Sequence, residues 1–371
     1  MSERLRALHR DHGQSPWLDN LKRSYITSGE LARQVERGIR GLTSNPTIFQ
    51  KAIQGSADYD EQFRDLVSAG GDVIDHYWAL VLADIRGALD AFAPLHAESG
   101  GSDGFVSVEV DPGLATDGPG TESAARRLHL EINQPNLMVK IPATLESIPA
   151  IEQMIAEGRN VNVTLIFSLD RYQRVMDAYL RGLERLAAST TADLGGVASV
   201  ASFFISRVDT EVDRRLDAVG TAEARALRGT AAVAQARLAY QAFLQAFSGP
   251  RWDALARRGA RVQRPLWAST STKNPAYPDT LYVDELIGPD TVNTLPDATI
   301  DAFADHGTPA RTIDRPDSVE AARTSWTLLG TVGVDVDDVA AQLEREGVAS
   351  FQSSLDDLLA ALADKAASFS A

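Results

Sequence analysis

The chain of 371 residues is long enough for one large core, and a composition of 44% hydrophobic and 23% charged residues is ordinary for a globular protein. A formal net charge of −15 argues against non-specific binding to nucleic acid or to an anionic membrane surface. Any anionic substrate must therefore find cations gathered locally. The lack of cysteine excludes disulfides, thiolate nucleophiles and thiolate metal sites.

The sequence shows no targeting or membrane segment. Residues 1–14 mix charges of both signs without an apolar run, and no later stretch has about 18 uninterrupted apolar residues. We therefore expect a cytoplasmic protein with neither a membrane nor a nucleic acid as its partner. No surface pattern decides between a monomer and a homodimer.

Short β-rich runs alternate along the chain with longer helical patterns, an order typical of parallel βα units. The predicted strands span residues 15–19, 39–44, 105–110, 137–141, 160–167, 198–204, 264–269 and 291–295. The helical patterns between them span residues 28–37, 72–91, 122–131, 148–156, 169–188 and 221–247. Eight strands with crossover helices predict an α/β fold, a (β/α)8 TIM barrel, whose usual length is about 250 residues.

The remaining length is accounted for by additional helices. Beyond the last strand, helical patterns span residues 319–329, 336–346 and 355–367, and we expect these C-terminal helices to pack on the barrel. No linker or internal repeat divides the chain. We therefore predict a single domain, residues 1–371.

One lysine, Lys140, lies inside the apolar strand predicted at residues 137–141, where a buried ammonium is costly. As a free amine it could attack a carbonyl and form a Schiff base. The alternative interpretation is a lysine at a strand end whose ammonium reaches solvent. Polar residues on the neighbouring strands favour the first interpretation.

These polar residues fall at the C-terminal ends of the predicted strands, where barrels place their active sites. They are Asp19, Asn45, Glu109, Lys140, Asn162, Thr164 and Ser202. Asn162 and Thr164 are two residues apart, so they share one face of their strand. Asn45, which precedes Pro46, could equally be a turn or helix-capping residue. Two carboxyl groups and a lysine together are what Schiff-base aldol chemistry requires.

Four segments, residues 41–49, 106–110, 138–144 and 162–168, resemble the motifs of the transaldolase family in their order and spacing. Residues 17–21 also resemble the first-strand segment of the bacterial branch of that family. The resemblance implies a class I enzyme of the pentose phosphate pathway that needs no cofactor and acts on sugar phosphates. Such an enzyme moves a dihydroxyacetone unit between sedoheptulose 7-phosphate and glyceraldehyde 3-phosphate, giving erythrose 4-phosphate and fructose 6-phosphate.

The resemblance also implies a role for each candidate site residue. Lys140 matches the Schiff-base lysine, Glu109 the acid that acts through a bound water, and Asp19 the base of carbon–carbon cleavage. Thr164 would position the water. The residues matching contacts to the dihydroxyacetone unit are Asn45, Asn162 and Ser202. The other substrate-binding residues, mostly phosphate contacts, are Phe204, Arg207, Ser271 and Lys273.

Two observations bear on these assignments. Arg207 could instead form a surface ion pair with Asp209 or Glu211. Lys273 stands where many family members have arginine, so a single ammonium replaces a guanidinium that could form two parallel hydrogen bonds.

The six histidines show no metal-ligand spacing, and no phosphate-binding glycine loop is present, so we expect neither a metal nor a nucleotide cofactor.

Three functions remain open. The nearest rival to transaldolase is a fructose 6-phosphate aldolase of the same superfamily, which releases free dihydroxyacetone. Glu109 and Phe204 stand where those smaller enzymes typically have glutamine and tyrosine, and therefore favour transfer. The third possibility is a catalytically idle barrel that only binds sugar phosphates, which trapping of a substrate adduct with borohydride would exclude.

Overall fold

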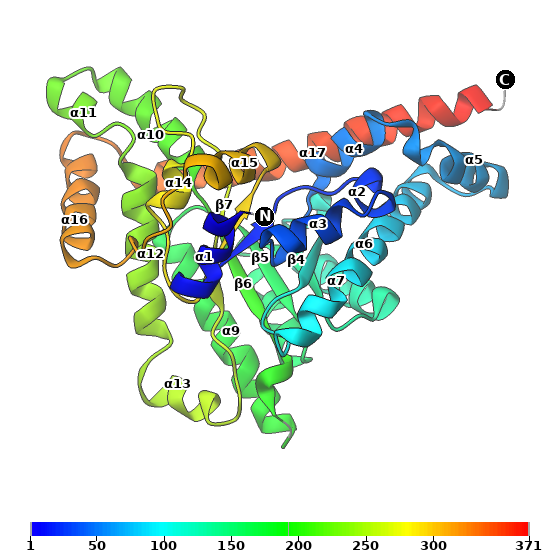
Figure 1. Ribbon diagram of the computed structural model, residues 1–371, viewed down its shortest axis with the longest axis horizontal. Helices are drawn as coiled ribbons and strands as arrows, with labels where there is room; N and C mark the ends of the chain where they lie inside the picture. The colour runs from blue at the N-terminus through cyan, green and yellow to red at the C-terminus, as the bar shows by residue number, and fades with distance from the viewer. Residues whose placement is uncertain (1, 192, 370–371) are drawn as a thin grey trace.

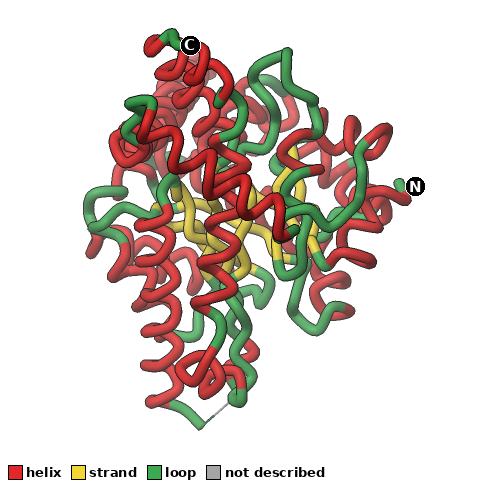
Figure 2. Tube along the Cα trace, turned by 90° about the vertical axis from the view of Figure 1, so that its left-hand side faces the viewer, coloured by secondary structure: helices red, strands yellow, loops and turns green. Residues whose placement is uncertain are grey.

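The computed structural model describes residues 2–191 and 193–369, and its eight parallel strands close into a barrel in chain order. The strands are β1 (Gln14–Leu18), β2 (Gly41–Thr43), β3 (Phe105–Glu109), β4 (Leu137–Pro142), β5 (Val161–Ile166), β6 (Ser199–Phe204), β7 (Arg264–Ala268) and β8 (Thr291–Leu295). Helices surround this barrel on its outside (Figure 2). The predicted (β/α)8 fold with additional helices is therefore confirmed.

Seventeen α-helices are found in the described residues. They are α1 (Glu3–His12), α2 (Arg23–Thr27), α3 (Glu30–Arg37), α4 (Pro46–Gln54), α5 (Asp60–Ala69), α6 (Val73–Glu98), α7 (Gly118–Ile132), α8 (Ile148–Ala156), α9 (Leu169–Ser189), α10 (Ser206–Val219), α11 (Ala222–Ala226), α12 (Ala231–Ala246), α13 (Gly249–Ala256), α14 (Leu281–Asp284), α15 (Asp297–His306), α16 (Pro316–Thr331) and α17 (Val336–Phe369). Among these helices, none is both long enough and apolar enough to cross a bilayer.

The helix predicted over residues 221–247 is wrong in one respect, because the structure divides it into α11 and α12. Gly229 lies in the break with φ +70°, a left-handed conformation that interrupts a right-handed helix. The predicted strands, by contrast, agree with the structure to within a few residues at each end.

The C-terminal helices differ more from the prediction, since residues 336–346 and 355–367 belong to one continuous helix, α17. Figure 1 shows α17 (red) running along the top of the molecule beside α4. At Gly347 it approaches β5 so closely that a Cβ atom would lie 2.9 Å from Leu165 Cδ2. Further along, the Ser354 and Thr47 hydroxyls share a hydrogen bond of 2.7 Å. Helix α17 therefore crosses the barrel end at which the strands finish.

Candidate active site

A cavity of about 310 Å³ opens at the C-terminal ends of the strands, and α4 and α17 form part of its wall. Nine of the eleven predicted site residues line this cavity: Asp19, Asn45, Lys140, Thr164, Ser202, Phe204, Arg207, Ser271 and Lys273. The other two, Glu109 and Asn162, contact lining residues from behind. The structure therefore brings all of the predicted residues together.

Lys140 and Glu109 form a buried ion pair next to the cavity. They are paired in register on β4 and β3, and Lys140 Nζ lies 2.9 Å from Glu109 Oε2. The ammonium also donates a hydrogen bond to the Ser44 carbonyl oxygen at 3.0 Å. Both side chains are only 5% exposed, so the alternative of a lysine that reaches solvent is wrong. Burial raises the pKa of the Glu109 carboxyl, although the nearby ammonium opposes that shift.

Asp19 follows β1 on the same cavity wall. Its Oδ1 accepts a hydrogen bond from Thr43 Oγ1 at 2.7 Å, and the Thr43 and Thr294 hydroxyls lie 2.6 Å apart. Burial raises the pKa of Asp19, an effect that the Thr43 hydrogen bond and Lys140 reduce. A carboxylate with a raised pKa is better able to accept a proton from a hydroxyl.

Asn162 lies below the cavity and not on its surface. Its Nδ2 donates to Ser107 Oγ at 3.0 Å, and its Oδ1 accepts from Ser202 Oγ at 2.7 Å. The amide therefore orients Ser202, which does line the cavity. Thr164 Oγ1 is buried and has no hydrogen-bond partner among the described residues, so its hydroxyl is available to a substrate group or to a water.

Asn45 satisfies both of its sequence-based interpretations. It caps α4, because its Oδ1 accepts a hydrogen bond from the Ile48 backbone N–H at 3.0 Å, and it also lines the cavity. With its oxygen engaged in the cap, the side-chain amide nitrogen is the group left for a substrate.

Arg207 faces two aromatic rings, with its guanidinium carbon 5.3 Å from the centre of Phe204 and 6.0 Å from that of Phe351. The alternative ion pairs do not form. Asp209 accepts a hydrogen bond from the Tyr282 hydroxyl, and Glu211 is bound by arginines of its own helix. Throughout the described part of the chain, no carboxylate lies within ion-pair distance of Arg207. Its charge therefore remains available to an anion.

The second predicted phosphate contact follows β7. Lys273 Nζ donates to Ser271 Oγ at 2.7 Å, and both residues line the cavity. Their loop begins at Ser269, which adopts φ +57°. Arg207, Ser271 and Lys273 thus face the same space, as a phosphate site requires.

The cavity wall also holds ten residues that were not predicted as site residues, among them Ser350, Phe351 and Lys51. Ser350 and Phe351 come from α17, in the interval between two predicted helices, and the Phe351 ring centre lies 5.9 Å from Lys140 Nζ. Lys51 comes from α4, a helix that was not predicted. The Asn45–Pro46 pair was the available signal for that helix, since a capping residue followed by proline is a common helix start.

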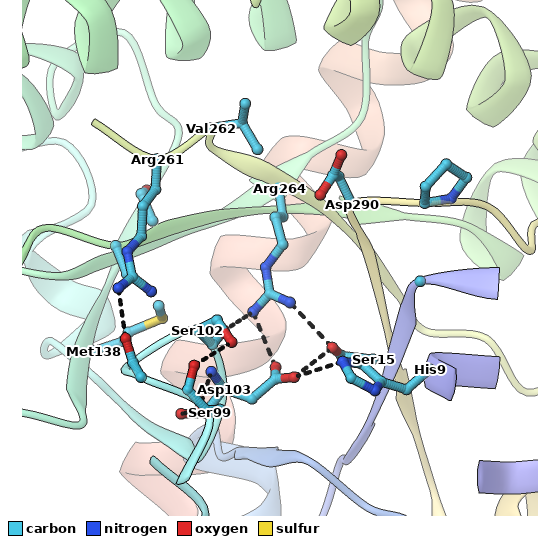
Figure 3. A pocket seen from close by; sticks show the side chains of 15 residues that line it. His9, Ser15, Ser99, Ser102, Asp103, Met138, Arg261, Val262, Arg264 and Asp290 are labelled. Carbon is cyan, nitrogen blue, oxygen red and sulfur yellow. Dashed lines mark hydrogen bonds and ion pairs between the residues drawn. The ribbon is translucent and has the colours of Figure 1, made fainter. Parts of the chain in front are cut away.

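A larger cavity, of about 520 Å³, lies at the opposite end of the barrel, where the strands begin. Figure 3 shows three of its polar side chains, Arg264, Ser15 and His9, pointing toward Asp103, which is 1% exposed. Arg264 lies 3.1 Å from this carboxylate, Arg40 2.6 Å, and Ser15 donates to it at 2.8 Å. Because these groups already bind one another, this cavity offers fewer free groups for chemistry than the smaller one.

Known proteins share extensive sequence similarity with this chain. A family model described as transaldolase/fructose-6-phosphate aldolase matches residues 16–362. A transaldolase of Parafrankia sp. is 53% identical over 349 residues, 94% of each chain. A transaldolase of Frankia alni is 51% identical over 95% of each chain, and one of Thermobifida fusca is 51% identical over 96% of this chain and 97% of its own. The chain therefore belongs to the transaldolase/fructose-6-phosphate aldolase family.

Proposed function

We propose that the smaller cavity is the active site of a transaldolase of the pentose phosphate pathway. The reaction moves a dihydroxyacetone unit between sedoheptulose 7-phosphate and glyceraldehyde 3-phosphate, and gives erythrose 4-phosphate and fructose 6-phosphate. The observation that carries the proposal is the buried amine of Lys140, 2.9 Å from Glu109 and on the wall of a cavity that Asp19 shares.

In the first stage the ketose carbonyl becomes an iminium on Lys140. Glu109 accepts the proton of the ammonium, and the free amine attacks the carbonyl carbon to give a carbinolamine. Glu109 then returns a proton to the carbinolamine hydroxyl, which leaves as water. The raised pKa of Glu109 suits a group that must both hold and release a proton. The free Thr164 hydroxyl is placed to orient the water that takes part in this exchange.

In the second stage Asp19 accepts the proton of the C4 hydroxyl, and the C3–C4 bond breaks. The bonding electrons move into the iminium and form an enamine, so the aldose phosphate leaves while the three-carbon unit stays covalently attached. The enamine then attacks the carbonyl carbon of the acceptor aldehyde, and Asp19 returns its proton to the new hydroxyl. Hydrolysis of the iminium releases the product ketose and regenerates Lys140.

The remaining residues hold the substrate. Arg207, Ser271 and Lys273 bind the phosphate, and the guanidinium supplies a bidentate contact. Asn45 and Ser202 bind hydroxyls of the dihydroxyacetone unit. We assign Asn162 to positioning Ser202, because its amide is already engaged. Phe204 contributes the apolar wall beside Arg207.

A coupled assay tests the proposal. The protein, supplied with sedoheptulose 7-phosphate and glyceraldehyde 3-phosphate, should form erythrose 4-phosphate and fructose 6-phosphate in equal amounts. A fructose 6-phosphate aldolase would instead release free dihydroxyacetone without an acceptor. A barrel that only binds sugar phosphates would form neither product, and either of these results would contradict the assignment.

We also propose that residues 1–371 act as one cytoplasmic domain. Helix α17 supports this organisation, because it supplies Ser350 and Phe351 to a cavity built otherwise from the barrel. All of the proposed reacting groups belong to one chain, so a monomer or a homodimer would serve equally well.

A further inference from the structure

Lysine is rare in this chain and gathers at the cavity. Among 36 Lys and Arg residues only five are lysines: Lys22, Lys51, Lys140, Lys273 and Lys365. Three of these five, Lys51, Lys140 and Lys273, line the single cavity to which the chemistry is assigned. The function proposed above uses Lys140 and Lys273 and leaves Lys51 unexplained.

The two lysines outside the cavity have partners that account for them. Lys22 Nζ lies 4.4 Å from the centre of the Tyr25 ring, and Lys365 is ion-paired with Asp60. Lys51 is exposed, and within the described residues no carboxylate lies within ion-pair distance of its ammonium. A structural role through an ion pair is therefore not available to Lys51.

The position of Lys51 relative to the phosphate contacts is informative. Its helix, α4, follows β2, which lies opposite β6 in the closed barrel of eight strands. Arg207 follows β6, and Lys273 follows β7. Burial lowers the pKa of Lys273, and the charges of Arg207 and Lys51 lower it further, so the fields of these two cations reach Lys273. The cavity therefore collects unpaired positive charge from both sides of its opening.

We propose that Lys51 is a third cation of the substrate phosphate site, binding the phosphate from the side opposite Arg207 and Lys273. A dianion placed between these residues would relieve their mutual repulsion, which the charge of Asp19 offsets only in part at Lys273. The long, flexible lysine stem allows one point charge to follow the phosphate as it enters. This inference rests on the proposed function, since it assigns Lys51 to the same substrate.

Titration calorimetry with inorganic phosphate at low ionic strength tests the inference directly. Lys51→Gln should raise the dissociation constant about threefold to tenfold, the range for a partly exposed charge contact combined with electrostatic attraction. Lys51→Arg, which keeps the charge, should stay within about twofold of the wild type. Lys22→Gln is the matched control, because it removes the same charge from a lysine outside the cavity, and it should leave phosphate binding unchanged. The inference is overturned if Lys51→Gln and Lys22→Gln have the same effect.

Kinetics provide the second readout. In Lys51→Gln, kcat/KM for fructose 6-phosphate should fall by the same factor through KM, with kcat within about twofold of wild type, and salt should shrink the difference. Fructose itself should be unaffected, and an equal loss for both sugars would contradict the inference. If the wild type transfers no dihydroxyacetone at all, the proposed function fails, while the phosphate titration still decides the role of Lys51.

Discussion

Each end of this barrel holds buried carboxyl groups near cations, but their pKa values are shifted in opposite directions at the two ends. At the N-terminal end burial alone would raise the pKa of Asp103, but Arg264, Arg40 and the Ser15 hydroxyl outweigh it and hold that pKa below its usual value. At the C-terminal end burial dominates and raises the pKa values of Glu109 and Asp19, despite Lys140 nearby. The two ends differ in direct contacts: two arginines lie within ion-pair distance of Asp103, whereas among the described residues Glu109 has one lysine at that distance and Asp19 has none.

Because of this difference, we expect Asp103 to contribute to stability, and Asp19 and Glu109 to take part in the chemistry. Asp103 is bound by two arginines and a hydroxyl, so its ionised form is the stable one and the network ties β1, β7 and the approach to β3 together. The partners of Asp19 and Glu109 do not offset the effect of burial on their pKa values, and we therefore expect these two carboxyls to exchange protons. A barrel commonly keeps stabilising contacts at the N-terminal ends of its strands and reactive groups at the other end.

The largest expected effect is loss of the Lys140 amine. Lys140→Arg keeps the positive charge beside Glu109 but removes the nucleophile, because a guanidinium stays protonated. Turnover in the coupled assay should fall by about 10⁴-fold or more. The mirror change at the other end, Arg264→Lys, also keeps its charge and should leave turnover within about twofold. Comparable losses of turnover in the two variants would contradict the assignment of the chemistry to the C-terminal end of the barrel.

Next come the two carboxylates, which should slow different steps. Asp19→Asn cannot accept the C4 hydroxyl proton, so a Schiff base should form and accumulate. Glu109→Gln cannot move protons to and from the carbinolamine, so formation of the Schiff base itself should slow. Each loss should be about 10²–10⁴-fold. Single-turnover measurements distinguish the steps, and a common rate-limiting step in both variants would refute this division of roles.

Arg207→Ala should have a smaller effect, confined to phosphorylated substrates. A charge-assisted contact is worth about 1.5–3 kcal/mol, so kcat/KM for fructose 6-phosphate should fall about 10–150-fold. Lys273→Ala should act in the same direction but less strongly, because a point charge lacks the bidentate fork. The unphosphorylated sugar serves as the control. If Arg207→Ala lowered kcat/KM equally for fructose, the phosphate would have to bind elsewhere.

The smallest effect on turnover, and the largest on stability, is expected for Asp103→Asn. It leaves two partly buried arginines without their carboxylate and should lower the free energy of unfolding by about 3 kcal/mol. Asp19→Asn should instead leave stability unchanged or raise it by up to about 1 kcal/mol, since it removes an ionised group whose burial is unfavourable. Urea denaturation measures both variants, and a loss of stability in Asp19→Asn as large as in Asp103→Asn would break the comparison.

The opposite pKa shifts of Asp103 and Asp19 also predict how stability depends on pH. The pKa of Asp103 is lowered by folding, so its contribution is present above its unfolded pKa, near 3.9, and is lost as the pH falls through its folded value. The raised pKa of Asp19 acts in the opposite direction, since protonating Asp19 favours the folded state. Asp103→Asn should therefore lose less stability than the wild type below about pH 4.

Much of this architecture could be predicted because local patterns determine it. The strands of the barrel are short apolar runs between helices, and their C-terminal residues lie at one end by the geometry of a parallel barrel. The side chains that reach the cavity from these strand ends, such as Lys140 and Thr164, were predicted for that reason.

What could not be predicted depends on tertiary contacts. Residues 347–354, between the two predicted C-terminal helices, include a glycine and three serines, which weaken helix propensity. They are helical because Gly347 packs on β5 and Ser354 bonds to Thr47, and this stretch contributes Phe351 to the cavity. The amide of Asn162 is expected to contact the substrate, and its hydrogen bonds to Ser107 and Ser202 could not be predicted from the sequence.

The central claim is that Lys140, among the lysines of this cavity, carries the substrate as a Schiff base. Incubating the protein with fructose 6-phosphate, reducing it with borohydride and mapping the peptides by mass spectrometry tests this claim most directly. The account predicts a reduced dihydroxyacetone adduct on the peptide that contains Lys140, and none in Lys140→Arg. An adduct on Lys51 or Lys273, or no adduct in the wild type, would contradict it.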